Sequence, residues 1–454
     1  MKASNDRRTF KEPDGPAGYP LVGILPHLRK NPLQYFVNVS REFGDIVRLD
    51  FGPRRFYLVN HPDYIQLILQ DNQAIFEKGY DLVKPVTGNG LIASEGEFWR
   101  RQRRIVQPAF HRNKVSALVS IMTDNVRAMT ERWAVFSDAG TAVDVEEEML
   151  RLTRHNIVRT MFSLDIDGDL AQTSKDFDAC LHYLAQLMKA PFEFMTYVPT
   201  PTNLRFRQAR RRLDDLVYTI LEKRREHPAE SDDLLGLLLA ARDDATNEAM
   251  TDQQLRDEIM TLLITGHETT ASALTWTWYL LSKHPGVLAE MQREMAAVLG
   301  EKPPEFEHLQ KLKYFGMVID EVLRLYPSTW LFARKATQRF ELGAFQIPKK
   351  AMLFLSPFIV HRDERFWHKP TVFRPERFLQ DAKEDRHPFA YFPFGGGPRR
   401  CLGETVALTV MKLVLVMVLQ RYRLEPVQEH EIKPVPRATL RMSDKLRMAI
   451  QIKR

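Results

Sequence analysis

The stretch FGGGPRRCLGE, residues Phe394–Glu404, decides how this sequence is interpreted. It contains Cys401, one of 2 cysteines in 454 residues, after consecutive glycines and arginines and directly before an apolar run. The glycines permit a tight turn around the sulfur, and the run from Leu402 predicts a helix whose N-terminal end faces the thiol. Backbone N–H groups and positive charge at such a place favour a thiolate.

From the residues alone, Cys401 has several open roles, of which a buried structural cysteine is one. A hydrolytic nucleophile needs a positioned histidine and an orienting group, and no such signature surrounds Cys401. A zinc ligand needs partner cysteines, and only Cys180 remains. An axial ligand to haem iron needs one thiolate and no second cysteine. The haem role therefore demands least from the rest of the chain.

The composition indicates a globular protein, with 44% hydrophobic and 27% charged residues. The formal charge of +7 and the pI near 9.2 favour an acidic partner or an anionic surface. A nucleic-acid partner is not indicated, because the basic residues are dispersed and no recognition motif accompanies them.

The scarcity of cysteine indicates a reducing, intracellular compartment, and we expect a cytoplasmic location. The N-terminal sequence MKASNDRRTFKE lacks the apolar region of a signal peptide. The most apolar run, residues 406–419, contains Lys412 and is too short to span a bilayer. It predicts a buried core helix, and no membrane span is expected.

Local patterns predict a chain dominated by helix. An extended Pro-rich segment at 13–26 precedes a hairpin at 46–60, and helical blocks follow from about 95 to 283. Strands return late, in ELGAFQIP, AMLFLSP and LRMAIQI. A minor sheet that mixes N-terminal and C-terminal segments would argue for one domain.

A long helix is predicted from Thr251, which with Gln254 forms a capping-box pattern, to just before Pro285. The segment Thr265–Thr270 puts glycine, acid and hydroxyls where core residues belong, so a local distortion is expected. A Thr-rich packing face with Glu268 exposed is the alternative. A zinc motif is excluded, because the position that needs a second histidine holds Ala271.

These motifs together resemble one known family. The spacing Phe394-x-x-Gly397-x-Arg399-x-Cys401-x-Gly403 resembles the haem-binding loop of the cytochrome P-450 family. Further signatures occur in the family's order: Gly266-x-Glu268-Thr269-Thr270, Glu321-Val-Leu-Arg324 and Pro375-Glu376-Arg377-Phe378. The resemblance implies a mainly α fold with a minor mixed β-sheet, in one domain over residues 1–454 that opens with a Pro-rich segment at 1–30. Haem would lie between the long central helix and the helix after the cysteine.

The resemblance also implies residue roles. Cys401 would be the axial ligand of haem b, and Thr269 with Glu268 would deliver protons for O₂ activation. Haem contacts would come from Trp99, Arg103, Arg399, Arg334, Phe394, Gly403 and Gly266. A charge network of Glu321, Arg324 and Arg377 would brace the cysteine loop, whereas the residues alone would equally suit a surface i,i+3 ion pair.

The implied substrate is a small apolar molecule bound by loops near 82–92, 191–206 and 329–332. Pocket candidates are Val86, Trp330, Leu331 and Thr265, the last standing where the family usually has Ala or Gly. Fatty acids, terpenoids, steroids and polyketides all qualify as substrates.

The implied reaction is a monooxygenase reaction, hydroxylation or epoxidation with one oxygen atom from O₂. Electrons would come from NAD(P)H through a reductase and a separate acidic ferredoxin or flavodoxin, for which Arg100, Arg104 and Arg400 are left free. The protein is expected to be a monomer. The alternatives are a peroxide-using or isomerising relative, which would normally lack the acid and alcohol pair, and a non-catalytic haem sensor.

Overall fold

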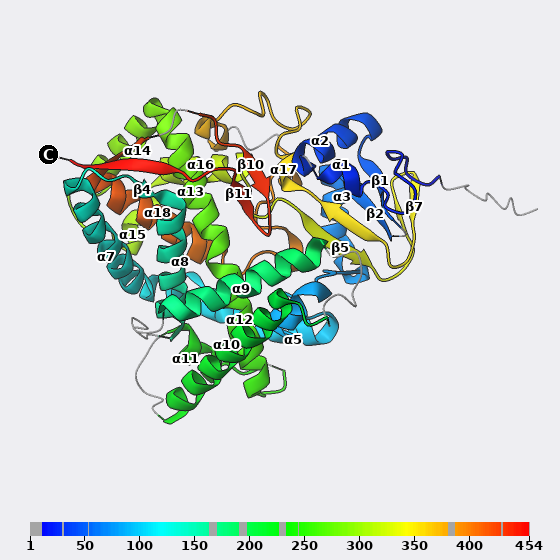
Figure 1. Ribbon diagram of the computed structural model, residues 1–454, viewed down its shortest axis with the longest axis horizontal. Helices are drawn as coiled ribbons and strands as arrows, with labels where there is room; N and C mark the ends of the chain where they lie inside the picture. Colours follow the sequence, from blue (N-terminus) through cyan, green and yellow to red (C-terminus); the bar gives the residue numbers. More distant parts are fainter. Residues whose placement is uncertain are drawn as a thin grey trace, which may run out of the picture. The chain divides into compact units, whose positions relative to one another are not determined.

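The computed structural model describes residues 11–29, 31–52, 54–162, 170–189, 198–226, 233–243, 245–379, 386–427 and 430–453. The backbone divides into two compact units, which are described one at a time (Figure 1). The first unit comprises Met1–Gly79, Trp330–Val372 and Asp385–Cys401, and the second comprises Tyr80–Thr329, Phe373–Glu384 and Leu402–Arg454. A single domain over residues 1–454 stays a prediction.

The second unit is mostly helical. Its α-helices are α4 (Lys84–Thr87), α5 (Gly96–Val106), α6 (Arg112–Ala117), α7 (Val119–Asp138), α8 (Val145–Phe162), α9 (Leu170–Lys189), α10 (Pro201–Glu226), α11 (Leu234–Ala240), α12 (Asp252–Gly266), α13 (Glu268–Lys283), α14 (Pro285–Val298), α15 (Phe306–Lys311), α16 (Lys313–Leu325) and α18 (Glu404–Arg421). Short 3₁₀ turns are η3 (Asp81–Val83), η4 (Gln107–Phe110) and η6 (Pro375–Phe378). Among the described residues, no helix is both long and apolar enough to cross a membrane.

Two small sheets complete the second unit. Strands β4 (Val143–Asp144), β12 (Arg447–Ile452) and β9 (Tyr422–Pro426) form one antiparallel sheet with β12 in the middle, and β10 (Pro434–Pro436) pairs with β11 (Leu440–Met442). The predicted strand LRMAIQI is therefore confirmed as β12. It pairs with β4 and β9 rather than with the N-terminal hairpin, so of the late strands AMLFLSP, but not LRMAIQI, shares a sheet with N-terminal strands.

The first unit is built on a five-stranded sheet of order β1-β2-β8-β5-β3. Its strands are β1 (Ile46–Phe51), β2 (Arg54–Val59), β8 (Met352–Leu355), β5 (Phe332–Ala336) and β3 (Phe76–Glu77), and only β2 and β8 run parallel. The predicted hairpin and the AMLFLSP strand are confirmed as β1 with β2 and as β8. ELGAFQIP forms a separate hairpin of β6 (Phe340–Leu342) and β7 (Phe345–Ile347). The prediction of a mainly α fold with a minor mixed sheet is confirmed.

The remaining elements of the first unit are short. They are α1 (Leu25–Leu28), α2 (Pro32–Phe43), α3 (Pro62–Gln66), α17 (Pro357–Val360), a π-helical turn η1 (Leu67–Asp71), and the 3₁₀ turns η2 (Gln73–Ile75), η8 (Pro388–Ala390) and η9 (Gly397–Arg399). The Pro-rich segment lies along β1, where Arg48 donates its N–H to the Asp14 carbonyl over 2.9 Å. The extended segment predicted there is confirmed up to Gly18, after which a turn closed by hydrogen bonds between Tyr19 and Gly23 precedes α1.

Helix α18 is the core helix predicted from the apolar run, and most of its side chains from Thr409 to Leu419 are buried. Lys412 is accommodated because its Nζ donates to the Leu309 carbonyl over 2.9 Å. Burial lowers the pKa of this amine, partly offset by Glu294 and Asp320.

Candidate active site

The cysteine stretch folds into a closed loop at the end of the first unit. Cys401 donates its N–H to the Phe394 carbonyl over 2.9 Å, and η9 lies between them. Gly397 has φ of 63°, and a Cβ there would lie 1.9 Å from the Leu69 carbonyl oxygen. A Cβ on Gly396 would lie 2.4 Å from the Phe389 ring. The glycines are required because backbone and an aromatic ring occupy the space of a side chain.

Cys401 itself is exposed, so a buried structural cysteine, one of the alternatives for this residue, is wrong. Gly403, two residues later, is the N-cap of α18 and its carbonyl accepts the N–H of Ala407 over 2.9 Å. The other thiol, Cys180, is buried, and burial with the charges of Asp176 and Asp214 raises its pKa to about 12. Cys180 therefore remains a thiol at neutral pH.

The predicted long helix is broken in the second unit at His267, which separates α12 from α13. The predicted capping box of Thr251 and Gln254 starts α12. Around the break, side chains bond to backbone carbonyls one turn back: Thr269 Oγ1 to Thr265 O over 3.0 Å and His267 Nδ1 to Leu263 O over 2.8 Å. The predicted distortion is thus confirmed.

His267 is neutral at the break. A carbonyl oxygen only accepts, so the proton of the His267 ring is on Nδ1. Burial lowers the pKa of this imidazole. The carbonyl of Thr269 accepts from Ser328 Oγ over 2.7 Å, so backbone acceptors at the break are satisfied from another segment of the same unit.

Glu268 is 7% exposed, so the alternative of an exposed carboxylate is wrong. Its Oε1 accepts from Thr439 Oγ1 over 2.9 Å and from Arg441 Nη1 over 3.2 Å. Arg441 also pairs with Glu146. Burial alone would lower the pKa of the Arg441 guanidinium, but the charges and hydrogen bonds of both acids raise it. No local sequence pattern predicts Arg441 or Thr439 as partners of the acid.

Gly266 lies against a neighbouring helix. A Cβ there would lie 3.0 Å from the Ile157 side chain of α8, so close packing of α8 on α12 explains the glycine. Its haem contact stays a prediction. Thr265 is partly buried and donates its hydroxyl to the Thr261 carbonyl over 2.8 Å. Val86 is fully buried within a large apolar cluster that includes residues of α10 and α12.

Helix α5 carries Trp99, which is 5% exposed, and Arg103, whose Nε donates to Gln107 over 3.2 Å. The neighbouring arginines are already paired within this chain. Arg100 pairs with Glu97, and Arg104 Nη2 lies 3.1 Å from Asp243 Oδ2. The expectation that Arg100 and Arg104 are free for an electron donor is therefore wrong. The acid that pairs with Arg104 lies in the loop after α11. No local sequence pattern predicts that this acid lies beside α5.

The other candidates of the first unit lie in or beside β5. Arg334 is 4% exposed and donates to the Ala333 carbonyl over 2.8 Å. Trp330 stacks on Phe36 with ring centroids 6.2 Å apart. Leu331 packs against the apolar cluster that contains Phe36. Contacts of these residues with haem or substrate stay predictions, and residues 191–197 of the predicted 191–206 loop lie outside the described part of the chain.

The predicted charge network is present and fully buried. Arg324 donates to both carboxylate oxygens of Glu321, over 2.7 and 2.8 Å, and Arg377 Nε donates to Oε1 over 2.9 Å. The Arg374 N–H reaches the same oxygen over 2.9 Å. Glu321 and Arg324 are 0% exposed and Arg377 is 3% exposed, so the surface ion-pair alternative is wrong. Its bracing of the cysteine loop stays a prediction.

The surface hollow next to the N-terminal segment is not this site. Its volume is about 590 Å³, and Gly18, Tyr19, Leu21, Gly23, Asp50, Gly52, Arg55 and Pro348 line it. None of the predicted site residues is among them.

The family model described as Cytochrome P450 matches residues 13–449 of this chain. The chain belongs to the cytochrome P450 family. Cyclooctatin synthase of Streptomyces melanosporofaciens is 35% identical over 444 residues, which cover 95% of this chain and 94% of that protein. Pentalenene oxygenase of Streptomyces avermitilis is 32% identical over 448 residues, 98% of each chain.

The fold agrees with this membership. The crystal structure of the cytochrome P450DA haem domain superposes with a TM-score of 0.89 at 28% identity and covers 98% of each chain. The predicted resemblance and P450 fold are therefore confirmed. This P450 is an oxidoreductase, and its family uses haem b with O₂ and with electrons from NAD(P)H that arrive through a reductase.

Proposed function

We propose that this P450 is a haem-thiolate monooxygenase that hydroxylates a cyclic terpenoid. The observation that carries the substrate class is the pair of full-length relatives, whose names refer to cyclooctatin and to pentalenene. The apolar cluster around Val86, with Leu91, Phe206 and Leu263, supports a hydrocarbon-like ligand bound mainly by burial.

The residues present fit a haem with one thiolate ligand. Cys401 is an exposed thiol in a loop that glycines hold tight, whereas Cys180 is buried with a raised pKa. In this proposal the Cys401 sulfur would bind the haem iron, and Phe394, Gly403 and Gly266 would contact the group. When bound, haem b activates O₂ for insertion of one oxygen atom into an aliphatic C–H bond.

In this proposal three arginines and one indole N–H would hold the haem carboxylates. Trp99 and Arg103 belong to α5, Arg399 belongs to η9 and Arg334 belongs to β5. Arginine suits carboxylates because its planar guanidinium donates in pairs.

Protons reach the reacting oxygen through the residues of the helix break. The Thr269 hydroxyl, now donating to the Thr265 carbonyl, can rotate to hold a proton donor or a water. Glu268 supplies the proton, and the contacts with Thr439 and Arg441 orient its carboxylate. The Thr439 hydroxyl is both donor and acceptor, so it can relay a proton to this carboxylate.

Replacing Thr269 by valine keeps the side-chain shape and removes the hydroxyl. We expect unchanged haem content and substrate affinity, continued NADPH oxidation, and a roughly tenfold or larger fall in product formed per NADPH, because positioned proton transfer contributes about 10²–10⁴-fold in rate. Hydrogen peroxide should account for the missing product. Unchanged coupling in Thr269→Val and in Glu268→Gln would contradict this proton route.

A separate electron carrier, an acidic ferredoxin or flavodoxin, is part of this proposal. The net charge of +7 supports an acidic partner. In this proposal the partner docks on exposed cations of this chain, of which Arg400 beside Cys401 is one.

A spectral titration tests the substrate class. Cyclic terpenoid hydrocarbons and alcohols are expected to convert the ferric haem from low to high spin at micromolar concentrations, because burying an apolar ligand displaces water from the pocket. Linear fatty acids of equal carbon number should respond far more weakly. A response to fatty acids alone would contradict the terpenoid assignment while leaving the monooxygenase family intact.

A further inference from the structure

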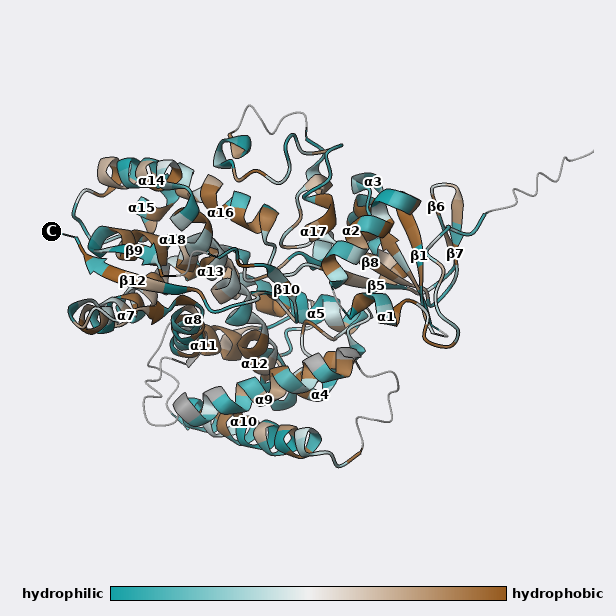
Figure 2. Ribbon diagram, turned by 45° about the horizontal axis from the view of Figure 1, so that its top comes forward, coloured by the Kyte–Doolittle hydropathy of each residue, from teal (hydrophilic) through white to brown (hydrophobic). Residues whose placement is uncertain are grey.

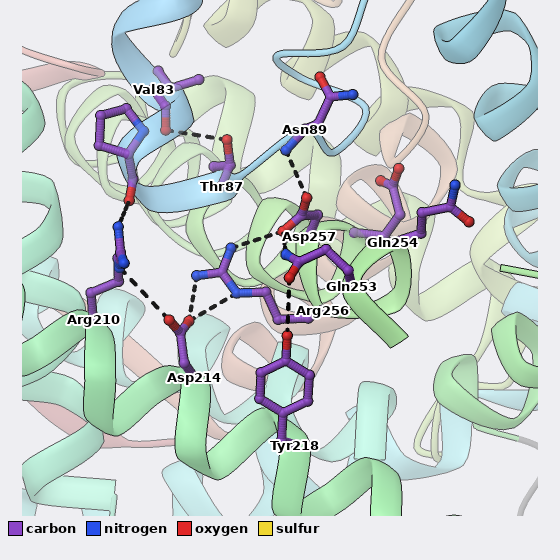
Figure 3. A network of polar contacts seen from close by, with 12 residues as sticks. Val83, Thr87, Asn89, Arg210, Asp214, Tyr218, Gln253, Gln254, Arg256 and Asp257 are labelled. Carbon is purple, nitrogen blue, oxygen red and sulfur yellow. Dashed lines mark hydrogen bonds and ion pairs between the residues drawn. The ribbon is translucent and has the colours of Figure 1, made fainter. Parts of the chain in front are cut away.

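The first turns of α12 carry two buried acids that hold a distant loop by its backbone. Asp257 Oδ2 accepts the N–H of Asn89 over 2.8 Å, and Glu258 Oε2 accepts the N–H of Leu91 over 3.0 Å. Asp257 is 6% exposed and Glu258 is 1% exposed. Figure 3 shows Asp257 between Asn89 and Arg256.

The loop lies directly on α12, and its Gly-Asn-Gly sequence fits that approach. Gly88 has φ of 59°, and a Cβ there would lie 2.1 Å from Asp257 Oδ1. A Cβ on Gly90 would lie 2.2 Å from Thr261 Oγ1 and 2.4 Å from the Asp257 carbonyl oxygen. No other residue type fits either position without moving the loop, so the acids and the glycines form one matched contact.

Arg256 supplies the countercharge and joins α12 to α10. Its Nη1 donates to Asp257 Oδ1 over 2.9 Å and its Nε donates to Asp214 of α10 over 2.8 Å (Figure 3). Burial alone would lower the pKa of Arg256, but Asp214 and Asp257 raise it, so it stays a cation. From the other side, Arg210 of α10 donates to the Pro85 carbonyl over 3.2 Å.

Segment 85–91 is therefore held by both helices while its apolar side chains face the core. Val86 is 0% exposed and lies in the same apolar cluster as Leu213 and Phe206 of α10 and Ile259 and Leu263 of α12. Figure 2 shows α10 mostly in the hydrophilic colour, in agreement with the many charged residues in the sequence of this helix. A shift of α10 would be transmitted to the segment through Arg256 and Arg210.

We propose that Asp257, Glu258 and Arg256 form a latch that fixes segment 85–91 as a wall of the substrate pocket and so determines which substrate carbon is oxidised. The latch residues are positioning residues, since they touch the segment and not the substrate. The proposal rests on the proposed function, because the segment lines the pocket only if the substrate binds as in that proposal.

The test compares Asp257→Ala with Asp252→Asn in the full-length holoprotein. Asp252 is the matched control, because it pairs with Arg225 of α10 from the same end of α12 but is half exposed. Loss of a hydrogen bond to a buried charged acceptor should speed amide exchange of residues 85–91 about tenfold or more. We expect a similar rise in the dissociation constant of a bound terpenoid and a broader product distribution, with haem content unchanged. Asp252→Asn should match the wild type.

A second variant acts without removing charge. Gly90→Ala pushes the segment off α12 by its clash with Thr261 and should reproduce the faster exchange and the altered product ratio. Unchanged exchange in Asp257→Ala would overturn the latch. Faster exchange with wild-type affinity and product ratios would equally overturn it, because the contact would then be structural only.

Failure of the proposed function has a different signature. In that case the wild type itself gives no spin-state response to any terpenoid. Amide exchange still decides then whether Asp257 and Glu258 hold the segment, since that measurement requires no substrate.

Discussion

Replacing Glu321 by glutamine is expected to lower the free energy of unfolding by about 3–5 kcal/mol, because it leaves buried charges without their partner. Arg324 and Arg377 both donate to this carboxylate, and all three side chains are almost wholly excluded from water. Burial lowers the pKa of Arg377 and the attraction of Glu321 opposes this, so the acid offsets part of the cost of burying the cation. The glutamine amide has a single oxygen acceptor, which is weaker than a carboxylate, for the two cations.

A surface pair of the same spacing provides the control. Asp124 and Arg127 of α7 are 2.8 Å apart with side chains 52% and 53% exposed. Asp124→Asn should cost no more than about 1 kcal/mol, the range of exposed ion pairs. Urea unfolding of the holoprotein, followed by circular dichroism, measures both. Equal midpoints for the two variants would show that the buried network contributes no more than a surface pair.

Removing all the charges together distinguishes pairing from mere packing. Glu321→Met combined with Arg324→Met and Arg377→Met should destabilise less than the sum of the single changes, because no buried charge is then left unpaired. Strict additivity of the changes would contradict the network interpretation.

Features that depend on neighbours in the chain were predictable from sequence. Thr251 and Gln254 form the capping box that their spacing predicts, and the helix breaks within the segment where glycine and threonines replace core residues. The β1–β2 hairpin follows from alternation around Gly52, which has φ of 61°. In each case the competing interactions lie within a few residues, so propensity and hydrogen-bonding chemistry decide the outcome.

Contacts between distant segments were not predictable. Arg441 lies 173 residues after Glu268 and Asp243 lies 139 residues after Arg104, and no periodic pattern links either pair. A charged residue looks the same in sequence whether solvent or a remote acid satisfies it. The prediction of free arginines on α5 failed for that reason.

Burial of the charge network shows the same limit. An i,i+3 pair of Glu321 and Arg324 predicts a helix surface, and only the family resemblance indicated a network with Arg377. The 3₁₀ turn η6 packs over that face of α16. It lies far along the chain from α16, since Arg374 and Glu321 are 53 residues apart. The burial that gives the network its energy therefore comes from topology and not from local pattern.

The largest functional effect is expected from Cys401→Ala, which should abolish both the strongly red-shifted Soret band of the reduced carbon monoxide complex and all detectable monooxygenase turnover. No other thiol can take its place. Cys180 is buried in the second unit with a pKa raised to about 12, so at pH 7 it is a thiol and not a thiolate. Loss of the band would therefore reflect loss of the only available thiolate.

The matched control is Cys180→Ala, which removes the other cysteine and leaves the loop of residues 394–403 intact. It should retain the red-shifted band and turnover, with at most a modest loss of stability from the small cavity in the apolar cluster that contains Cys180. Carbon monoxide difference spectra of both variants, at equal haem content, decide the assignment. A red-shifted band that survives Cys401→Ala and disappears in Cys180→Ala would transfer the ligand role to the buried thiol, against its raised pKa and its burial.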